Sequence, residues 1–328
     1  MRDLRILVVG GAGYVGSHFC LHAMDAGIEV DVLDNLSKGH RSALRCSNFI
    51  EADLINFDEI HELLSLTSYG TIFHFAASAL VGESVANPSM YYRNNIIAAY
   101  NLLEAMRLTR HQKMVFSSTC AVYGYPQSIP INENHPKNPI SPYGRTKLAM
   151  EWMLEDYHTA YGIKSASLRY FNAAGCESGR GLGEDHEPES HLIPNVVKAA
   201  LGQSPELVIF GNDYPTSDGT CIRDYIHVND LAVAHVAAME KLETQGLIQL
   251  NLGTGVGYSN LQIVQAVASA CGHDLKPRFA ARRQGDPAEL VADASKAYGM
   301  LNWKPYRSDI GSIINDVIRW FSEHPAGY

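Results

Sequence analysis

Tyr143 and Lys147 stand four residues apart in the stretch SPYGRTK, and together they could move a proton. Residues four apart on a helix share a face. A lysine ammonium beside a phenol stabilises the phenolate and lowers the pKa of the tyrosine. Such a tyrosine can take the proton of an alcohol while a hydride leaves the same carbon. The spacing alone occurs often by chance, so this interpretation depends on the rest of the chain.

Hydroxyl groups stand at the end of the stretch that precedes this pair. KMVFSST ends in Ser117, Ser118 and Thr119, and it has the composition of a buried strand. One of these hydroxyls could orient or relay the proton that the tyrosine takes. A dehydrogenase-type reaction also needs a hydride acceptor, and a second motif indicates which one.

The stretch VVGGAGYVGSH places Gly10, Gly13 and Gly16 between an expected strand and an expected helix. Glycines let the backbone approach a pyrophosphate, and the helix N-terminus offers free N–H groups and a positive dipole end. Asp34 ends the next strand about twenty residues later, where a carboxylate accepts both ribose hydroxyls of adenosine and repels a 2′-phosphate. The pattern predicts NAD rather than NADP, although Lys38 lies close by. Asp53 could hydrogen-bond the adenine end.

Strands and helices alternate over the first half of the chain. This alternation predicts an α/β fold with a doubly wound parallel sheet of the Rossmann type and right-handed crossovers. Helices are expected at residues 17–27, 57–66, 90–108 and 142–162. Strands are expected at residues 4–11, 29–35, 48–53, 71–77, 113–119 and 164–172.

The regular alternation ends after Asn172, which predicts a domain boundary. Residues 173–190 are rich in Gly, Glu and Ser and are expected to form a loop. We expect an NAD-binding domain at 1–172 and a smaller, mixed α/β substrate domain at 173–328. Part of the segment at about 225–260, near Ile248 to Leu252, is expected to return to the first sheet.

Composition excludes several classes of function. The 328 residues carry a net charge of −9 and no basic tail, which argues against nucleic-acid and membrane-surface binding. No apolar run is long enough to cross a membrane, and the N-terminus lacks the features of a signal peptide. Six scattered cysteines without a CxxC motif indicate reduced thiols in a cytoplasmic protein and give no support for a metal site.

Stretches spread nearly from end to end resemble the extended short-chain dehydrogenase/reductase family, and within it the members that epimerise UDP-hexoses. They include GGAGYVGSH, HFAA, YYRNN, FSSTCAVYG, SPYGRTK, LRYFNAAG, FGNDYPTSDGTCIRDYIHVNDLA, NLGTGVG and RRQGDPAELVAD. The resemblance implies NAD-dependent inversion at C4 of UDP-glucose and UDP-galactose through a transient 4-keto intermediate. It also implies tightly held NAD, a UDP-sugar-binding second domain and a homodimer formed by the two long helices.

The resemblance assigns a role to each matching residue. Tyr143 would be the general base, Lys147 would bind the nicotinamide ribose, and Thr119 would hydrogen-bond O4 of the sugar. The implied cofactor contacts are Gly10, Gly13, Tyr14, Val15, Gly16, Asp34, Asn35, Asp53, Leu54, Phe75, Ala76, Ala77, Asn94, Ser117, Tyr143, Lys147 and Tyr170. The implied substrate contacts are Thr119, Tyr143, Asn172, His191, Leu192, Val208, Phe210, Arg223, Arg283, Asp286 and Leu290.

Three departures from the family pattern bear on these expectations. Ala79 replaces a common lysine, which could loosen NAD, and His191 stands where asparagine is common. Leu290 is intermediate in size at the position that limits the C2 substituent of the sugar, so UDP-N-acetylglucosamine is an alternative substrate.

The same scaffold supports other activities. A UDP-pentose 4-epimerase stays open. A dehydratase would need an Asp–Glu pair where Cys120 and Ala121 follow Thr119. A non-catalytic NAD-binding regulator is a remote alternative, because such a protein would have no need of Tyr143 and Lys147.

Overall fold

The computed structural model describes residues 5–204, 206–283 and 285–328, and a seven-stranded parallel sheet forms its centre. The strand order is β10-β6-β5-β4-β1-β2-β3. This arrangement confirms the predicted doubly wound sheet, although Leu4, the first residue of the first expected strand, lies outside the described residues. The strands are β1 (Arg5–Val9), β2 (Glu29–Asp34), β3 (Asn48–Glu51), β4 (Thr71–His74), β5 (Lys113–Thr119), β6 (Lys164–Tyr170) and β10 (Leu247–Leu252).

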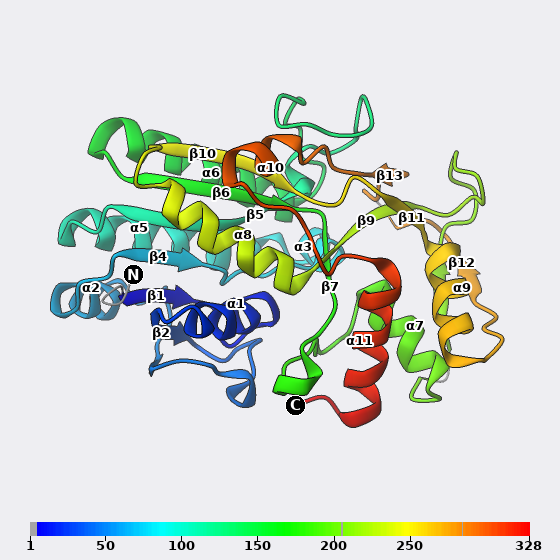
Figure 1. Ribbon diagram of the computed structural model, residues 1–328. Helices are drawn as coiled ribbons and strands as arrows, with labels where there is room; N and C mark the ends of the chain where they lie inside the picture. Colours follow the sequence, from blue (N-terminus) through cyan, green and yellow to red (C-terminus); the bar gives the residue numbers. More distant parts are fainter. Residues whose placement is uncertain (1–4, 205, 284) are drawn as a thin grey trace.

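Helices cover both faces of this sheet (Figure 1). Side chains alternate along each strand, so Ile6 and Val8 of β1 face one layer while Leu7 and Val9 face the other. The first layer contains α1 (Tyr14–Asp25), α8 (Val228–Lys241) and α10 (Ser295–Leu301). The second contains α2 (Phe57–Leu66), α5 (Ala98–Thr109) and α6 (Pro142–Tyr161). Burial on both faces explains the continuous apolar run Ile6–Val9 of β1.

The helix expected at residues 90–108 is divided in the structure. It consists of α4 (Pro88–Tyr92), a π-helical turn η2 (Arg93–Ile97) and α5, with the short helix α3 (Val81–Ala86) before them. The turn contains Asn95, whose side-chain amide donates to the Ser78 carbonyl at 3.0 Å and to the Thr146 hydroxyl at 3.0 Å. It also contains Asn94, whose amide donates to the Ser78 hydroxyl at 3.2 Å. These bonds join the turn to the end of β4 and to α6.

The strand expected at residues 164–172 ends two residues early, at Tyr170. After Phe171 the chain forms β7 (Asn172–Ala174), which pairs in parallel with β9 (Ile222–His227) outside the large sheet. The expected loop at 173–190 therefore begins as a strand, and it also holds the turn η4 (Ser178–Arg180). The start of this segment forms a strand because β9, which is distant in sequence, supplies its hydrogen-bonding partners.

The remaining elements form a second body beyond the carboxyl ends of the large sheet (Figure 1). Its core contains buried residues of three helices, including Val196, Ile263 and Trp320. These helices are α7 (Leu192–Ala200), α9 (Asn260–Cys271) and α11 (Ile310–Glu323). Its other strands are β11 (Gly257–Ser259) and β13 (Glu289–Leu290), which pair with β9, and the pair β8 (Val208–Phe210) and β12 (Arg278–Ala280). Two further turns are η1 (Arg41–Ala43) and η3 (Cys120–Val122).

The expected return of a late segment to the first sheet is confirmed. β10 pairs in parallel with β6, with Leu247 opposite Ser165 and Leu252 opposite Tyr170. The division into domains at residue 172 stays a prediction. Among the described residues, no helix has both the length and the apolar character that a membrane crossing requires.

Candidate active site

The residues expected to do chemistry meet at the carboxyl ends of neighbouring parallel strands. The glycine-rich loop follows β1, Thr119 ends β5, and Tyr143 and Lys147 lie in the first two turns of α6. The start of α6 is set by Ser141, whose hydroxyl accepts the Gly144 N–H at 3.2 Å, and by a proline at its first position. The structure thus brings Thr119 of β5 together with Tyr143 and Lys147 of α6.

Lys147 is buried, with 3% of its surface exposed. Its Nζ donates to the Ser117 carbonyl at 2.7 Å and lies 4.8 Å from the centre of the Phe116 ring and 6.0 Å from that of Tyr143. Burial lowers the pKa of Lys147 to about 7. The lysine can therefore gain or lose a proton near neutral pH.

Tyr143 departs from the expectation that its pKa would be lowered. Burial raises the pKa of Tyr143 to about 12, and the neighbouring Thr119 hydroxyl opposes this rise. The Lys147 ammonium is directed to the Ser117 carbonyl rather than to the phenol oxygen. The protein chain by itself thus keeps the phenol protonated, and a lower pKa requires a further positive charge.

Thr119 has one hydroxyl hydrogen to donate, and either the neighbouring Tyr143 oxygen or a ligand can accept it. Its Oγ1 accepts the Ala121 N–H at 3.2 Å, which uses an acceptor site of the hydroxyl and leaves the donor. The next residue, Cys120, is buried in an apolar cluster with Leu148 and Leu290. Ala121 has no polar side chain, so this position lacks the acid and base of a dehydratase.

A buried ion pair positions α6 against the sheet. Arg169 of β6 donates to Glu151 of α6 through Nε at 2.8 Å and through Nη2 at 2.7 Å, and both side chains have 0% exposure. Ser118 of β5 donates to the same carboxylate at 2.6 Å. Glu151 and Arg169 were not predicted from the sequence. The sequence did contain one indication of Glu151, which continues the four-residue spacing of Tyr143 and Lys147.

The glycine-rich loop requires glycine at two positions for packing. Gly10 has φ +84°, and a Cβ there would lie 2.4 Å from the Ala76 backbone nitrogen. A Cβ on Gly16 would lie 2.1 Å from the Gly10 carbonyl oxygen. Asp34 holds the loop, because its carboxylate accepts the Ala12 N–H at 3.0 Å and the Leu36 N–H at 2.8 Å. Burial raises the pKa of Asp34.

Gly13 and the start of α1 fit a phosphate-bearing ligand. Among the described residues, the one atom within 4 Å of a Cβ placed on Gly13 would be the Gly10 carbonyl oxygen, at 3.5 Å. Packing of the chain therefore does not demand glycine there, whereas close approach of a ligand would. Gly13 caps α1 without any side-chain hydrogen bond to the first N–H groups. A pyrophosphate at this position would meet free donors and the positive end of the helix dipole.

The other expected cofactor contacts divide into two groups. Some lie at the edge of the sheet: Asn35 donates to the Asp53 carboxylate at 3.1 Å, Asn94 to Ser78 at 3.2 Å, and Ala79 is exposed just after β4. Ser117, Ala76 and Ala77 are half-buried at strand ends. Others contact side chains or backbone of the protein itself. The Tyr14 hydroxyl donates to the Gly175 carbonyl at 2.6 Å, and the Tyr170 hydroxyl bonds His235 at 2.6 Å. Val15, Leu54 and Phe75 pack in the hydrophobic cores.

Two residues expected to contact a diphosphate-linked sugar also contact each other. Arg223 of β9 is 8% exposed and forms an ion pair with Asp286. It also donates to the Pro287 carbonyl at 2.9 Å. Leu290 of β13 stands opposite Arg223 in the strand pairing and packs with Cys120, so this strand reaches the end of β5. The pair fixes the guanidinium near the candidate catalytic residues.

The remaining expected substrate contacts lie on the second body. The Arg283 guanidinium is exposed and lies 4.2 Å above the Phe210 ring, and Val208 shares β8 with Phe210. Asn172 begins β7, while His191 and Leu192 begin α7.

Three side chains that sequence analysis did not single out surround His191: Glu184, His186 and Glu189. The signal for them was the occurrence of five His and Glu side chains within the eight residues 184–191.

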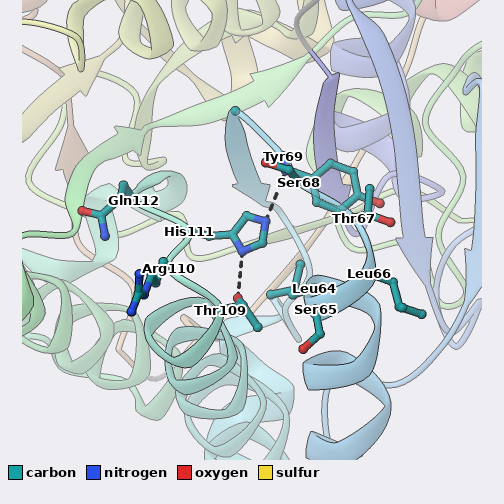
Figure 2. Close-up of a pocket in the computed structure, with 11 residues that line it drawn as sticks. Leu64, Ser65, Leu66, Thr67, Ser68, Tyr69, Thr109, Arg110, His111 and Gln112 are labelled. Carbon is teal, nitrogen blue, oxygen red and sulfur yellow. Dashed lines mark hydrogen bonds between the residues drawn. The ribbon is translucent and has the colours of Figure 1, made fainter.

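A hollow at the opposite end of the sheet does not belong to this site (Figure 2). It has a volume of about 430 Å³ and is lined by residues 64–70 and 109–112, which precede β4 and β5. Within it, His111 bonds the Thr109 hydroxyl at 2.8 Å and accepts the Tyr69 N–H at 3.2 Å. The imidazole is used in joining two loops, and all the expected chemistry lies at the other strand ends.

Comparison with known proteins agrees with this geometry. Residues 6–253 match the NAD dependent epimerase/dehydratase family. The chain is 47% identical to the UDP-glucose 4-epimerase of Halalkalibacterium halodurans, covering 99% of this chain and 98% of the relative. It is similar to the crystal structure of UDP-glucose 4-epimerase from Brucella ovis in complex with NAD, at 48% identity, TM-score 0.94, and coverage of 97% and 98%. The epimerase from Bifidobacterium longum in complex with NAD⁺ and UDP is 36% identical, with TM-score 0.95 and coverage of 99% and 100%.

Proposed function

The chain belongs to the NAD-dependent epimerase/dehydratase family, and we propose that within this family it interconverts UDP-glucose and UDP-galactose by inverting C4 of the hexose, with NAD as its cofactor. The observation that supports this most is the meeting of Thr119, Tyr143 and Lys147 beside a glycine-rich loop suited to a dinucleotide. Similarity to UDP-glucose 4-epimerases along the whole chain selects this reaction among those of the family.

The residues that would hold NAD follow the edge of the sheet. The loop from Gly10 to Gly16 and the uncapped start of α1 would bind the pyrophosphate. Asp34 would accept the adenosine ribose hydroxyls with the lone pairs that Ala12 and Leu36 leave free. Bound NAD would supply the acceptor and donor of the C4 hydride, together with a positive charge that favours the Tyr143 phenolate.

Tyr143 is the general base in this proposal, and two neighbours prepare it. Its phenolate would take the O4 proton of the hexose, and the phenol so formed would later return it. Thr119 donates a hydrogen bond to O4 with the hydrogen that its contact with Ala121 leaves free. Lys147, anchored on the Ser117 carbonyl, adds positive charge near the phenol when it is protonated.

The second body would anchor the UDP part of the substrate. Arg223 and Arg283 carry the positive charge for a diphosphate, and Arg223 is already oriented by Asp286. Inversion at C4 requires that opposite faces of the same hexose meet Tyr143 in turn. A firm hold on UDP and a weak hold on the sugar meet this requirement, because the binding energy then comes from the part that does not react.

Leu290 favours UDP-N-acetylhexosamines as a second substrate class. Its side chain is 8% exposed and belongs to the same buried cluster as Cys120 and Phe171. A leucine leaves more room than a tyrosine at a position where the C2 substituent of the sugar would lie. UDP-pentoses also fit a site that holds the sugar weakly.

We propose further that the protein is a cytoplasmic homodimer. Large apolar side chains are exposed on α5 and α6, which lie together on one face of the sheet. They include Tyr100 at 48%, Leu108 at 49%, Trp152 at 55% and Tyr161 at 49% exposure. A paired-helix interface would cover them. Sedimentation velocity of the purified chain tests the dimer.

Turnover without added NAD tests the proposed function. Purified protein is given UDP-galactose or UDP-N-acetylgalactosamine, and the product is measured by chromatography. We expect UDP-glucose to form, and Tyr143→Phe to lower kcat at least about a hundredfold because the proton acceptor is lost. The matched control is Tyr306→Phe, which removes an equal hydroxyl at a site with 65% exposure. Lack of turnover of both substrates, even with NAD supplied, would contradict the proposal.

A further inference from the structure

Four side chains of the segment between β7 and α7 converge on one point. Glu184, His186, Glu189 and His191 each offer one ligand atom, and these atoms all lie within 4.8 Å of one another. His186 Nδ1 lies 3.4 Å from a Glu184 oxygen and 3.5 Å from a Glu189 oxygen. His191 Nδ1 lies 3.8 Å from the other Glu189 oxygen and contacts Glu184 directly. Two imidazoles and two carboxylates thus face a common centre.

These separations match those between the ligands of a tetrahedral metal ion. Zinc bonds to histidine nitrogen and carboxylate oxygen are about 2.0–2.1 Å long, so tetrahedral geometry places ligand atoms about 3.4 Å apart. Octahedral geometry at the same bond length would place neighbouring ligands about 3.0 Å apart. The distances of 3.4 and 3.5 Å from His186 Nδ1 to the Glu184 and Glu189 oxygens fit the tetrahedral arrangement better. An ion at the centre would separate the one closer pair, His191 and Glu184.

The carboxylate of Glu189 provides a separate indication of a ligand. Its Oε1 accepts the N–H groups of Ser190 and His191, both at 2.8 Å, which fixes the orientation of the group. Its Oε2 is buried and makes no hydrogen bond within the described residues, although His186 Nδ1 lies 3.5 Å away, and the side chain is 6% exposed. A buried polar atom without a partner costs about 1–3 kcal/mol. A cation at the centre of the cluster would satisfy this oxygen.

We propose that Glu184, His186, Glu189 and His191 bind one divalent transition-metal ion of the zinc type. Two carboxylates balance its two charges, and neutral imidazole with carboxylate is a ligand set that zinc accepts. The surroundings hold the ligands in place, as at known metal sites. The Glu184 carbonyl accepts the indole N–H of Trp320 at 3.2 Å, and the Glu184 side chain is 1% exposed.

The ion would fasten three parts of the molecule. The His186 ring lies edge-on to Tyr14 of α1 at 6.1 Å, and His40, after β2, bonds the Asp185 carbonyl at 3.1 Å. Trp320 belongs to α11, and His191 immediately precedes α7. The metal therefore has a structural role between the sheet and the second body. This proposal does not depend on the substrate or the reaction.

Metal binding by the whole, untagged protein tests the proposal. After treatment with EDTA and desalting, the protein is titrated with ZnCl₂ in a calorimeter, and CoCl₂ is added to a second sample for visible spectroscopy. We expect one ion per chain and the intense visible absorption of four-coordinate Co²⁺. Glu189→Gln should weaken zinc binding at least about tenfold, since one of four ligands is lost. Glu187→Gln, which removes a carboxylate from the same segment outside the cluster, should leave binding unchanged.

The cobalt spectrum of the unaltered protein needs no variant, so a folding defect in Glu189→Gln would not prevent a decision. Three results would overturn the proposal: no stoichiometric zinc binding, a weak six-coordinate cobalt spectrum, or equal loss of affinity in Glu189→Gln and Glu187→Gln. In the first case the cluster is a network of ion pairs between protonated histidines and carboxylates.

Discussion

The buried Lys147 should lower the free energy of unfolding of the protein, and its replacement by methionine should raise it. Burial brings the pKa of this lysine from 10.5 to about 7. Each unit of such a difference corresponds to about 1.4 kcal/mol, so holding the charged form in the folded chain costs about 5 kcal/mol. Methionine keeps an apolar stem of similar length and removes the charge. It also gives up the hydrogen bond to Ser117 at 2.7 Å and the contact with Phe116.

The destabilisation by Lys147 should decrease as the pH rises. The unfolded lysine keeps its proton up to its usual pKa, whereas the folded lysine loses it above about 7. The cost is therefore fully present below pH 7 and declines as pH rises toward 10.5, to about 2 kcal/mol at pH 9. After about 1–2 kcal/mol for the lost hydrogen bond, Lys147→Met should be more stable by about 3 kcal/mol at pH 7. At pH 9 the difference should be close to zero.

Urea unfolding of protein refolded without NAD, at pH 7 and pH 9, measures both values. Lys276→Met is the matched control, because its Nζ is on a side chain with 85% exposure and its effect should not change with pH. The same Lys147→Met variant should lose most of its epimerase activity at both pH values. A variant that is no more stable than the parent at pH 7, or whose advantage does not shrink at pH 9, would refute the reasoning.

Three further predictions follow from the packing. Gly13→Ala should leave the melting temperature within a few degrees of the parent, because its Cβ would meet one protein atom at 3.5 Å, but it should lower NAD retention at least about tenfold, measured by absorbance after gel filtration. Gly16→Ala should also destabilise the fold, because its Cβ would lie 2.1 Å from a carbonyl oxygen. Glu151→Ala should cost about 3–5 kcal/mol in urea unfolding because Arg169 stays buried without its partner, and adding Arg169→Met should recover much of that loss. Leu290→Ala should raise the rate with UDP-N-acetylgalactosamine relative to UDP-galactose; an unchanged ratio would show that this residue does not limit the C2 substituent.

Local patterns in the sequence were sufficient for much of the fold. The apolar runs that became β1 and β5, the glycine loop and the proline before Tyr143 act over a few residues, so their consequences could be predicted from those residues alone. The same is true of the shared helix face of Tyr143 and Lys147. The return of β10 to the sheet was also predicted, and its apolar residues Ile248, Leu250 and Leu252 alternate with Gln249 and Asn251 as in a strand.

Tertiary structure decided what depends on distant partners. β6 ends at Tyr170 because β9 offers hydrogen bonds to Asn172 and its neighbours. The pKa of Tyr143 rises because the assembled core buries the phenol, and no local spacing reports burial. Arg223 was expected to meet a ligand, and folding placed Asp286 beside it.

The sequence by itself therefore determined which elements form and which residue types stand at their ends. Hydrogen-bond periodicity, turn residues and apolar spacing act at short range and can be read along the chain. The folded structure decides which of those residues are charged, which are paired and which lack a partner, because it sets the burial and the neighbours of each side chain. Glu189 illustrates the difference, since its unpartnered oxygen exists only once the surrounding chain has excluded water from it.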